Sequence, residues 1–307
     1  MDRIKIYFAP MEGITTKTYR RVHRQFYPGV DRYYSPFIVV TSDHSFKRRD
    51  KRGILPYEEG LVPQLLTNDP EAFVWGAKKL ADSGYEEVNL NAGCPVGTVV
   101  AKGKGAGLLE NPDAFDAFLD SIFSNDDLPK ISIKTRVGFY ESSEAKRLAK
   151  ILSRYPFCEV TVHPRAREDY YNGTPDKEAF DVMAEIIKVP ICYNGDLCSV
   201  GDVNKLLSER NAIDRIMLGR GLIADPDLAG EIKTGERTGR LYEYLSCLRK
   251  EYKEELSGDR DVLFKLKEIW SYVGRGFPDH EKSLKTIRRC SNLTEYDIAV
   301  REILTPS

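Results

Sequence analysis

Short apolar segments alternate with longer amphipathic ones from residue 4 to about residue 235. The short segments have the length and the apolar content of strands, and the longer ones repeat their apolar residues at helical spacing. We predict strands at residues 4–11, 31–36, 61–66, 86–93, 130–138, 158–165, 189–196 and 215–221.

Several segments between these strands carry clear helix signals. A capping residue directly before a proline is the usual start of a helix, and it occurs three times. The three pairs are Asp69-Pro70, Asn111-Pro112 and Asp225-Pro226. The helix predicted at 70–83 ends at Gly84, and 112–123 and 143–153 each have one apolar face. Eight strands with helical crossovers predict a parallel (β/α)8 TIM barrel, an α/β fold, with a doubly wound open sheet as the alternative.

The pattern changes after residue 235, and no strand-like alternation follows. We predict a helix at 240–256, a second one with apolar residues spaced between Leu263 and Val273, and a last one from near Thr294. The chain therefore divides into a barrel domain and a small C-terminal all-α helical domain. The predicted boundaries are residues 1–237 and 238–307.

Composition narrows the class of protein. Apolar residues make up 41 % of the 307 residues and charged residues 30 %, which is ordinary for a soluble protein. Neither a transmembrane run nor a signal peptide is present, and the six cysteines form no C-x-x-C pair, so we expect a cytoplasmic protein with reduced thiols. The net charge of −1 means that nucleic-acid binding would need local basic patches. Nothing indicates an obligate protein partner or a metal site.

Polar residues stand at the carboxyl ends of seven of the eight predicted strands. Active sites of (β/α)8 barrels lie at these ends, and a buried polar group needs a partner that a polar ligand could supply. Taken singly, a lysine or histidine at such a place is more often a satisfied structural residue. The candidate residues at these ends, which are the polar groups with the proline, methionine and glycines beside them, are Pro10, Met11, Glu12, Gln64, Asn91, Cys94, Lys134, Arg136, His163, Arg165, Asn194, Gly195, Asp196, Gly219 and Arg220.

The types of these residues suggest a ligand. Gly219-Arg220-Gly221, with the helix predicted from Asp225, resembles the phosphate site that barrels form after their last strands. Lys134, Gln64 and Asn194 would suit the edge of a flavin, whose ring needs a cation and amide groups. Cys94 follows a strand that breaks at glycine and proline, so its thiol would lie at the site. The alternative for Cys94 is a buried structural cysteine.

Five motifs carry a resemblance to a known family. They are APMEG (9–13), NLNAGCP (89–95), KTRVG (134–138), NGD (194–196) and GRG (219–221). In order and spacing they are similar to those of the tRNA-dihydrouridine synthases, over nearly the whole chain, and Asn-x-Gly-Cys-Pro is the most specific. This resemblance implies a (β/α)8 barrel with a helical tRNA-binding domain, and reduction of the uracil 5,6 double bond in tRNA by FMN that NADPH recharges.

The resemblance also implies residue roles. Cys94 would be the proton donor, and a thiol near its reference pKa of about 8.5 is protonated at neutral pH. The FMN site would comprise Pro10, Met11, Glu12, Gln64, Lys134, His163, Asn194, Gly195, Asp196, Gly219 and Arg220, and the uracil or its phosphates would meet Asn91, Arg136, Arg165 and Arg167. The family commonly has His-Gly-Arg-Thr where this chain has HPRA (163–166). This departure concerns the substrate-binding role that the resemblance implies for Arg165.

Basic clusters are candidate RNA contacts, although a charge run is usually a solvated face. They are residues 47–52, the pair Lys102 and Lys104, and the stripe Lys282, Lys285, Arg288 and Arg289. Two alternative functions stay open. One is another flavin barrel, such as an ene-reductase or a dihydroorotate dehydrogenase, and the other is an RNA-binding protein on an inactive barrel. The uridine position, the choice between NADPH and NADH and the oligomeric state are not determined.

Overall fold

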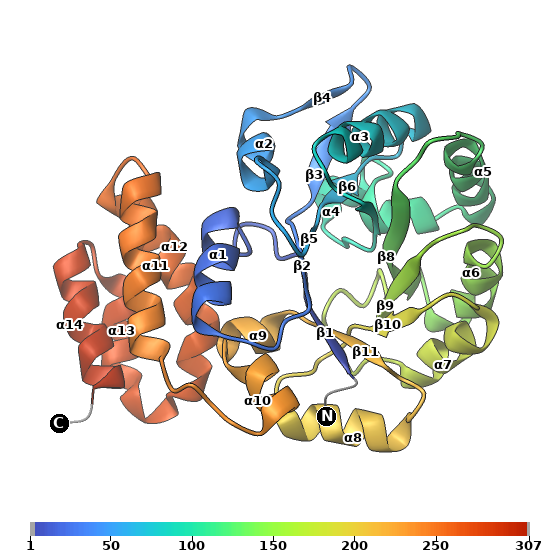
Figure 1. The fold of residues 1–307 in the computed structure, drawn as a ribbon. Helices are drawn as coiled ribbons and strands as arrows, with labels where there is room; N and C mark the ends of the chain where they lie inside the picture. The colour runs from blue at the N-terminus through green and yellow to red at the C-terminus, as the bar shows by residue number, and fades with distance from the viewer. Residues whose placement is uncertain (1–3, 306–307) are drawn as a thin grey trace.

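The computed structural model describes residues 4–305, and a single curled sheet dominates it (Figure 1). Neighbouring strands run parallel, apart from the short antiparallel pair β3 and β4. The strands are β1 (Lys5–Phe8), β2 (Arg32–Tyr34), β3 (Ile38–Thr41), β4 (Ser45–Phe46), β5 (Leu61–Val62), β6 (Gln64–Leu66), β7 (Glu87–Ala92), β8 (Lys130–Gly138), β9 (Glu159–Ala166), β10 (Ile191–Tyr193) and β11 (Arg215–Leu218).

The sheet closes on itself at Pro63. This residue separates β5 from β6, because a proline has no N–H to give to a ladder. β5 pairs with β2, while β6 pairs with β3 and β7, so one extended segment joins the two ends of the sheet. β2 and β3 are likewise consecutive parts of one extended segment. The sheet strands therefore correspond to the eight predicted strands of the barrel, with β4 as a short addition. The (β/α)8 prediction is confirmed, and the open-sheet alternative is wrong.

Helices surround the barrel, and most begin where their caps predict. The Asp69 carboxylate accepts hydrogen bonds from the N–H groups of Glu71 and Ala72 at the start of α3, and Asn111 caps α5 in the same way. The helices up to residue 234 are α1 (Lys17–Phe26), α2 (Arg48–Ile54), α3 (Pro70–Asp82), α4 (Gly97–Val100), α5 (Pro112–Phe123), α6 (Ala145–Leu152), α7 (Lys177–Ile186), α8 (Val200–Glu209), α9 (Arg220–Ala224) and α10 (Leu228–Thr234).

The helix start predicted at Asp225-Pro226 is wrong. The N–H of Asp225 donates to the carbonyl of Gly221 and so ends α9, while its own carbonyl accepts from Leu228 in the turn before α10. Asp225 therefore closes one helix instead of opening the next. The helix that follows the last strand begins earlier than predicted, at Arg220 itself.

The amino end of the barrel is closed by a buried acid that the sequence analysis did not single out. Glu159, 2 % exposed, accepts hydrogen bonds from the hydroxyl of Tyr7 (2.9 Å) and from the guanidinium of Arg215 (2.8 Å). Tyr7 belongs to a small buried cluster inside the barrel that also contains Cys192 and Met217. Side chains therefore fill this end of the barrel.

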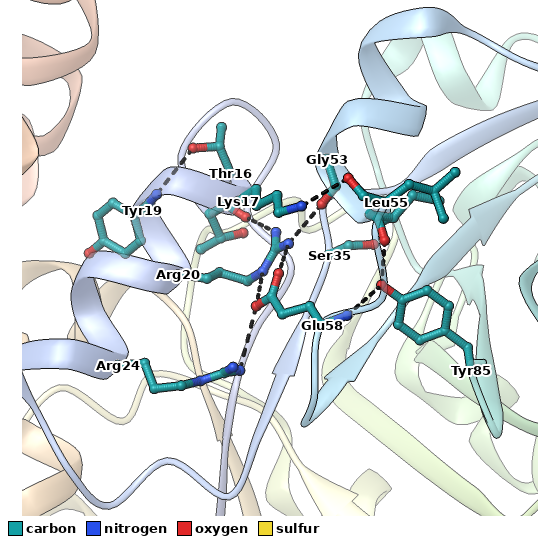
Figure 2. Close-up of polar contacts among 12 residues, drawn as sticks. Thr16, Lys17, Tyr19, Arg20, Arg24, Ser35, Gly53, Leu55, Glu58 and Tyr85 are labelled. Atoms are coloured by element: carbon teal, nitrogen blue, oxygen red, sulfur yellow. Dashed lines mark hydrogen bonds and ion pairs between the residues drawn. The ribbon is translucent and has the colours of Figure 1, made fainter. Parts of the chain in front are cut away.

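A second buried ion pair anchors α2 to the barrel. The guanidinium of Arg20, in α1, is 0 % exposed and donates to Glu58 at 2.7 Å and to the carbonyl of Gly53, in α2, at 2.8 Å (Figure 2). Lys17 adds a bond of 2.8 Å to the carbonyl of Leu55, the residue that ends α2. α2 carries the basic cluster 47–52, so this network fixes the position of that cluster.

The chain after residue 239 forms an all-α unit beside the barrel, at the opposite side from α5 and α6 (Figure 1). Its helices are α11 (Leu241–Glu255), α12 (Asp259–Val273), α13 (Glu281–Arg289) and α14 (Leu293–Leu304). α11 packs on α1, where Tyr244 is fully buried, and Lys265 of α12 donates to the carbonyl of Gly13 at 2.6 Å. The domain boundary at residues 237 and 238 stays a prediction. Among residues 4–305, no helix has both the length and the apolar content needed to cross a bilayer.

Candidate active site

Buried amides lie in a row across β6, β7 and β8. Asn91 donates to Gln64 at 2.7 Å, Gln64 donates to Asn89 at 2.7 Å, and Asn89 donates to the hydroxyl of Ser132 at 2.9 Å. All four side chains are 6 % exposed or less. Asn89 and Asn91 share one face of β7, as the alternation in the sequence predicts, and parallel pairing brings Gln64 beside them.

Cys94 lies directly beyond this row, in a loop held from both sides. The oxygen of the Asn91 amide accepts hydrogen bonds from the N–H groups of Gly93 (3.2 Å) and Cys94 (3.0 Å). On the other side, the guanidinium of Arg136 donates to the carbonyl of Gly93 at 3.0 Å. The side chain is partly exposed, and burial raises the pKa of the Cys94 thiol above its usual range. At neutral pH the group is therefore protonated, and it can give a proton.

Lys134 lies on β8 next to Asn91 in the register and is a cation without a protein partner. Among the described residues none forms a hydrogen bond or an ion pair with its ammonium group. Burial, and then the charge of Arg136, lower the pKa of Lys134 to about 8. A partly desolvated cation that lacks a counter-ion is a candidate contact for an anionic or strongly polar ligand.

His163, Arg165, Asp196 and Arg220 form one network at the ends of β9 and β10. Arg165, 1 % exposed, donates to the Nε2 of His163 at 3.1 Å and to both oxygens of Asp196, at 3.1 and 2.5 Å. Arg220 donates to Asp196 at 2.5 Å. Burial, with the charge of Arg136, holds the pKa of His163 well below its usual range. The ring is neutral with its proton on Nδ1, because Nε2 accepts from an arginine.

The remaining predicted cofactor residues line the same end of the barrel. The amide of Asn194 donates to the carbonyl of Met217 at 2.7 Å. Gly219 precedes α9, and a Cβ there would approach Met11 to 3.5 Å, whereas at Gly195 it would approach Pro164 to 3.2 Å. Pro10 and Met11 are partly exposed at the end of β1. Glu12 instead faces outward to Arg49, with 3.0 Å between them.

Arg136, Arg165 and Arg167 are already engaged by protein groups. Arg136, 1 % exposed, also donates to the carbonyls of Ala166 and Tyr170, both at 2.7 Å. Arg167 donates to the hydroxyl of Tyr170 at 2.9 Å and stacks on its ring. All three arginines thus hold the loop after β9 in place.

Tyr171, which the sequence analysis missed, stands over this network. Its ring lies 5.4 Å from the guanidinium carbon of Arg136 and 5.1 Å from that of Arg220, and its centroid is 6.0 Å from that of His163. The side chain is 52 % exposed. Two consecutive tyrosines after a strand with His163 were the only available signal, and a sequence cannot show that this loop folds back over the barrel.

The basic clusters occupy two separate surfaces. Lys104 is near Lys102 and Lys47, and burial together with these like charges lowers its pKa. The loop of Lys104 is bonded to the backbone of Cys94, since the N–H of Ala106 donates to the carbonyl of Cys94 at 3.0 Å. On α13, exposed basic residues alternate with the buried Ser283 and Ile287. Lys282, Lys285 and Arg289 line one groove there, and Arg288 is also exposed.

Comparison with known proteins gives the family. The sequence model for dihydrouridine synthase (Dus) matches residues 7–304. Similar proteins include the probable tRNA-dihydrouridine synthase 1 of Synechocystis sp., 28 % identical over 88 % of this chain and 78 % of its own. The probable tRNA-dihydrouridine synthase of Rickettsia bellii is 30 % identical over 75 % of this chain and 72 % of its own.

Solved structures share the fold at low identity. The old yellow enzyme from Trypanosoma cruzi superposes with a TM-score of 0.55 at 10 % identity, covering 82 % of this chain and 94 % of its own. Histamine dehydrogenase from Rhizobium sp. superposes with a TM-score of 0.57 at 13 % identity, covering 81 % of this chain and 48 % of its own. At these identities the likenesses show the fold alone. The match to the family along almost the whole sequence, with the thiol and the unpaired lysine at the mouth of the barrel, means that the chain belongs to the dihydrouridine synthase family.

Proposed function

We propose that this enzyme reduces specific uridines of tRNA to 5,6-dihydrouridine, with FMN as its tightly bound cofactor and NADPH as the transient reductant. The observation that carries the proposal is that a thiol kept protonated by burial, Cys94, follows strand β7, while Lys134, a partly buried cation with no partner among the described residues, lies on the neighbouring strand β8. A proton donor and an anion-stabilising group are what the reduction of a polarised double bond requires.

The residues present fit FMN. Lys134 would stand against the part of the flavin that becomes negative, and the neutral His163 would donate from Nδ1. Arg220 at the first residue of α9, with Gly219 lacking a side chain before it, would receive the phosphate. Gln64, Asn194, Gly195, Pro10 and Met11 would line the remaining edges, whereas Glu12 would act through Arg49 at the rim. Bound FMN would supply hydride to C6 of the uracil.

Cys94 would then give its proton to C5. Burial keeps the thiol protonated, and Asn91 and Arg136 hold the loop from which it projects. The uracil must leave its stack to reach the barrel mouth, which costs roughly a few kcal/mol and less in an unpaired loop. We propose that Asn91 meets the uracil through its free amide N–H. Arg165 and Arg167, whose guanidinium groups bond to protein, would shape this pocket and contact the substrate only at its edge.

The RNA surface would have two parts. Lys102 and Lys104 lie beside the thiol loop and close to the cluster at 47–52, so they would contact phosphates next to the target uridine. The exposed stripe of α13 would contact a more distant part of the tRNA, which gives the helical unit at 238–307 its role as the tRNA-binding domain. Such a substrate would place the enzyme in the cytoplasm.

A second candidate is reduction of a free small molecule, as in an ene-reductase or a dihydroorotate dehydrogenase. The old yellow enzyme from Trypanosoma cruzi favours it, since the two barrels superpose. Such an enzyme has no use for a helical unit with a basic stripe. Turnover with a free enone or dihydroorotate, and none with unmodified tRNA, would select this candidate.

The deciding experiment separates the two half-reactions in Cys94→Ala. We expect the variant to bind FMN and to be reduced by NADPH like the wild type, because neither step needs a proton at C5. Reoxidation by tRNA should slow by roughly 10²- to 10⁴-fold, the usual contribution of a general acid. Rapid mixing with absorbance detection measures both steps, and Cys198→Ala, at an exposed thiol, is the matched control.

Other outcomes have distinct meanings. A structural Cys94 predicts that flavin content, stability and both half-reactions fall together. An unchanged tRNA half-reaction removes Cys94 from the mechanism. A wild-type protein that is colourless and cannot be reconstituted with FMN ends the flavoenzyme proposal.

A further inference from the structure

The row of amides at the barrel mouth has a definite direction. At one end, the oxygen of Asn91 faces two backbone N–H groups, which can only donate, at 3.2 and 3.0 Å. The nitrogen of Asn91 must therefore face Gln64 and donate to it, and Gln64 must in turn donate to an acceptor on its far side. Asn89 supplies that acceptor at 2.7 Å.

Asn89 makes no hydrogen bond with the thiol loop, and among the residues of the proposed site it bonds only to Gln64. It is 0 % exposed, and its nitrogen donates to the hydroxyl of Ser132 at the other end of the row. Inward positions of barrel staves usually carry branched apolar residues, and a buried amide without bonds is costly. The hydrogen bond that Asn89 accepts from Gln64 explains why an asparagine occupies this position.

We propose that Asn89 is a positioning residue, whose side-chain oxygen fixes the orientation of Gln64 and, through Gln64, that of Asn91 and the Cys94 loop. In this orientation Gln64 and Asn91 each keep one amide N–H that no described residue accepts. Under the proposed function, on which this inference rests, Gln64 offers its N–H to the flavin and Asn91 offers its N–H to the uracil carbonyl.

Two substitutions separate this role from simple packing. Asn89→Asp keeps an oxygen for Gln64, and the hydroxyl of Ser132 can turn to donate to the second oxygen. Asn89→Leu keeps the volume and removes the acceptor. A positioning role predicts that Asn89→Asp stays closer to the wild type than Asn89→Leu. A packing role predicts the reverse order, because a carboxylate in this buried layer costs more than a leucine.

Two measurements on the full-length protein report the orientation of Gln64 and of the Cys94 loop without catalytic turnover. The first is the FMN dissociation constant, which Asn89→Leu should raise by roughly 5- to 10-fold, the effect of one neutral hydrogen bond, with Asn89→Asp within about 3-fold of the wild type. The second is the alkylation rate of Cys94 after flavin removal, followed by peptide mass spectrometry. This rate should increase several-fold in Asn89→Leu and stay close to the wild-type value in Asn89→Asp. Cys198, which is exposed, is the internal reference.

The outcomes are separable from those of the proposed function. If the wild type binds FMN and Asn89→Leu equals it in both measurements, the positioning role is wrong while the proposed function stands. If Asn89→Leu does not fold, Asn89→Asp still decides, because a loss of FMN affinity of more than about 10-fold there contradicts a role that an oxygen can fill. A wild type without flavin affinity ends the proposed function, and the alkylation rates then test the positioning of the Cys94 loop alone.

Discussion

Lys134, which we propose to contact the flavin, should lower the free energy of unfolding of the flavin-free protein. Its side chain is partly buried, its ammonium group has no hydrogen bond or ion pair among the described residues, and its pKa is lowered to about 8 from 10.5. At 1.36 kcal/mol per pKa unit, this difference sets an upper limit of about 3 kcal/mol on the stability lost at neutral pH, because the side chain keeps some contact with water. Replacing Lys134 by methionine, a flexible apolar side chain of similar length, should remove this cost.

We therefore expect Lys134→Met to raise the free energy of unfolding of the flavin-free protein by up to about 3 kcal/mol at pH 7. The same variant should bind FMN roughly 10- to 100-fold more weakly, because a charge-assisted hydrogen bond is lost. Urea unfolding followed by circular dichroism measures the first effect, and flavin fluorescence titration measures the second. Lys130→Met, at the exposed start of the same strand, is the matched control.

The pH dependence of the free energy of unfolding tests whether the lowered pKa of Lys134 causes the destabilisation. Between about pH 8 and 10.5 the unfolded chain holds a proton on Lys134 that the folded chain has lost, so wild-type stability should rise with pH through this interval. The advantage of Lys134→Met should shrink over the same interval and vanish above it. A flavin-free Lys134→Met protein that is less stable than the wild type at pH 7 would refute the reasoning.

Two further predictions concern the anchor of α2 and the surface of α13. Arg20→Met should lower the free energy of unfolding by about 1.5–3 kcal/mol, because Glu58 loses its shortest charged hydrogen bond and keeps only the 3.5 Å contact with Arg24. Urea unfolding measures the loss, and a change below about 1 kcal/mol would contradict it. Replacing the α13 stripe (Lys282, Lys285, Arg288 and Arg289) by alanine should weaken tRNA binding, reduce its salt dependence and spare NADPH oxidation. An unchanged salt dependence in a filter-binding titration would mean that the stripe is only a solvated face.

Much of the fold could be predicted because its signals are local. A cap followed by proline announces α3 and α5, and the side chains of Asp69 and Asn111 bond within three residues of themselves. The alternation around Asn89 and Asn91 likewise places both amides on one face of β7. Asp225 was compatible with either end of a helix, and the prediction chose the wrong one. Its side chain can cap the start of a helix, but in the structure its backbone N–H ends α9.

Many of the proposed site residues could be selected from sequence because they follow a predicted strand, and the barrel gathers those strand ends in one place; Gln64 and Lys134 instead lie within strands. Their partners were not identifiable. Arg165 looked like a group available to an anion, yet it is buried against Asp196, 31 residues later in the chain. Tyr171 offered no signal that would place it over Arg220.

What the sequence determined by itself was the order of the strands, the starts of most helices and the set of polar residues at the barrel mouth. Only the tertiary structure decided which of those polar groups are engaged and which are free. Lys134 has no partner within residues 4–305, while Gln64 and Arg136 are engaged by residues from neighbouring strands and loops. The physical reason is that backbone conformation responds to nearest neighbours along the chain. A buried polar group, by contrast, must find its partner in space, and distant segments supply that partner.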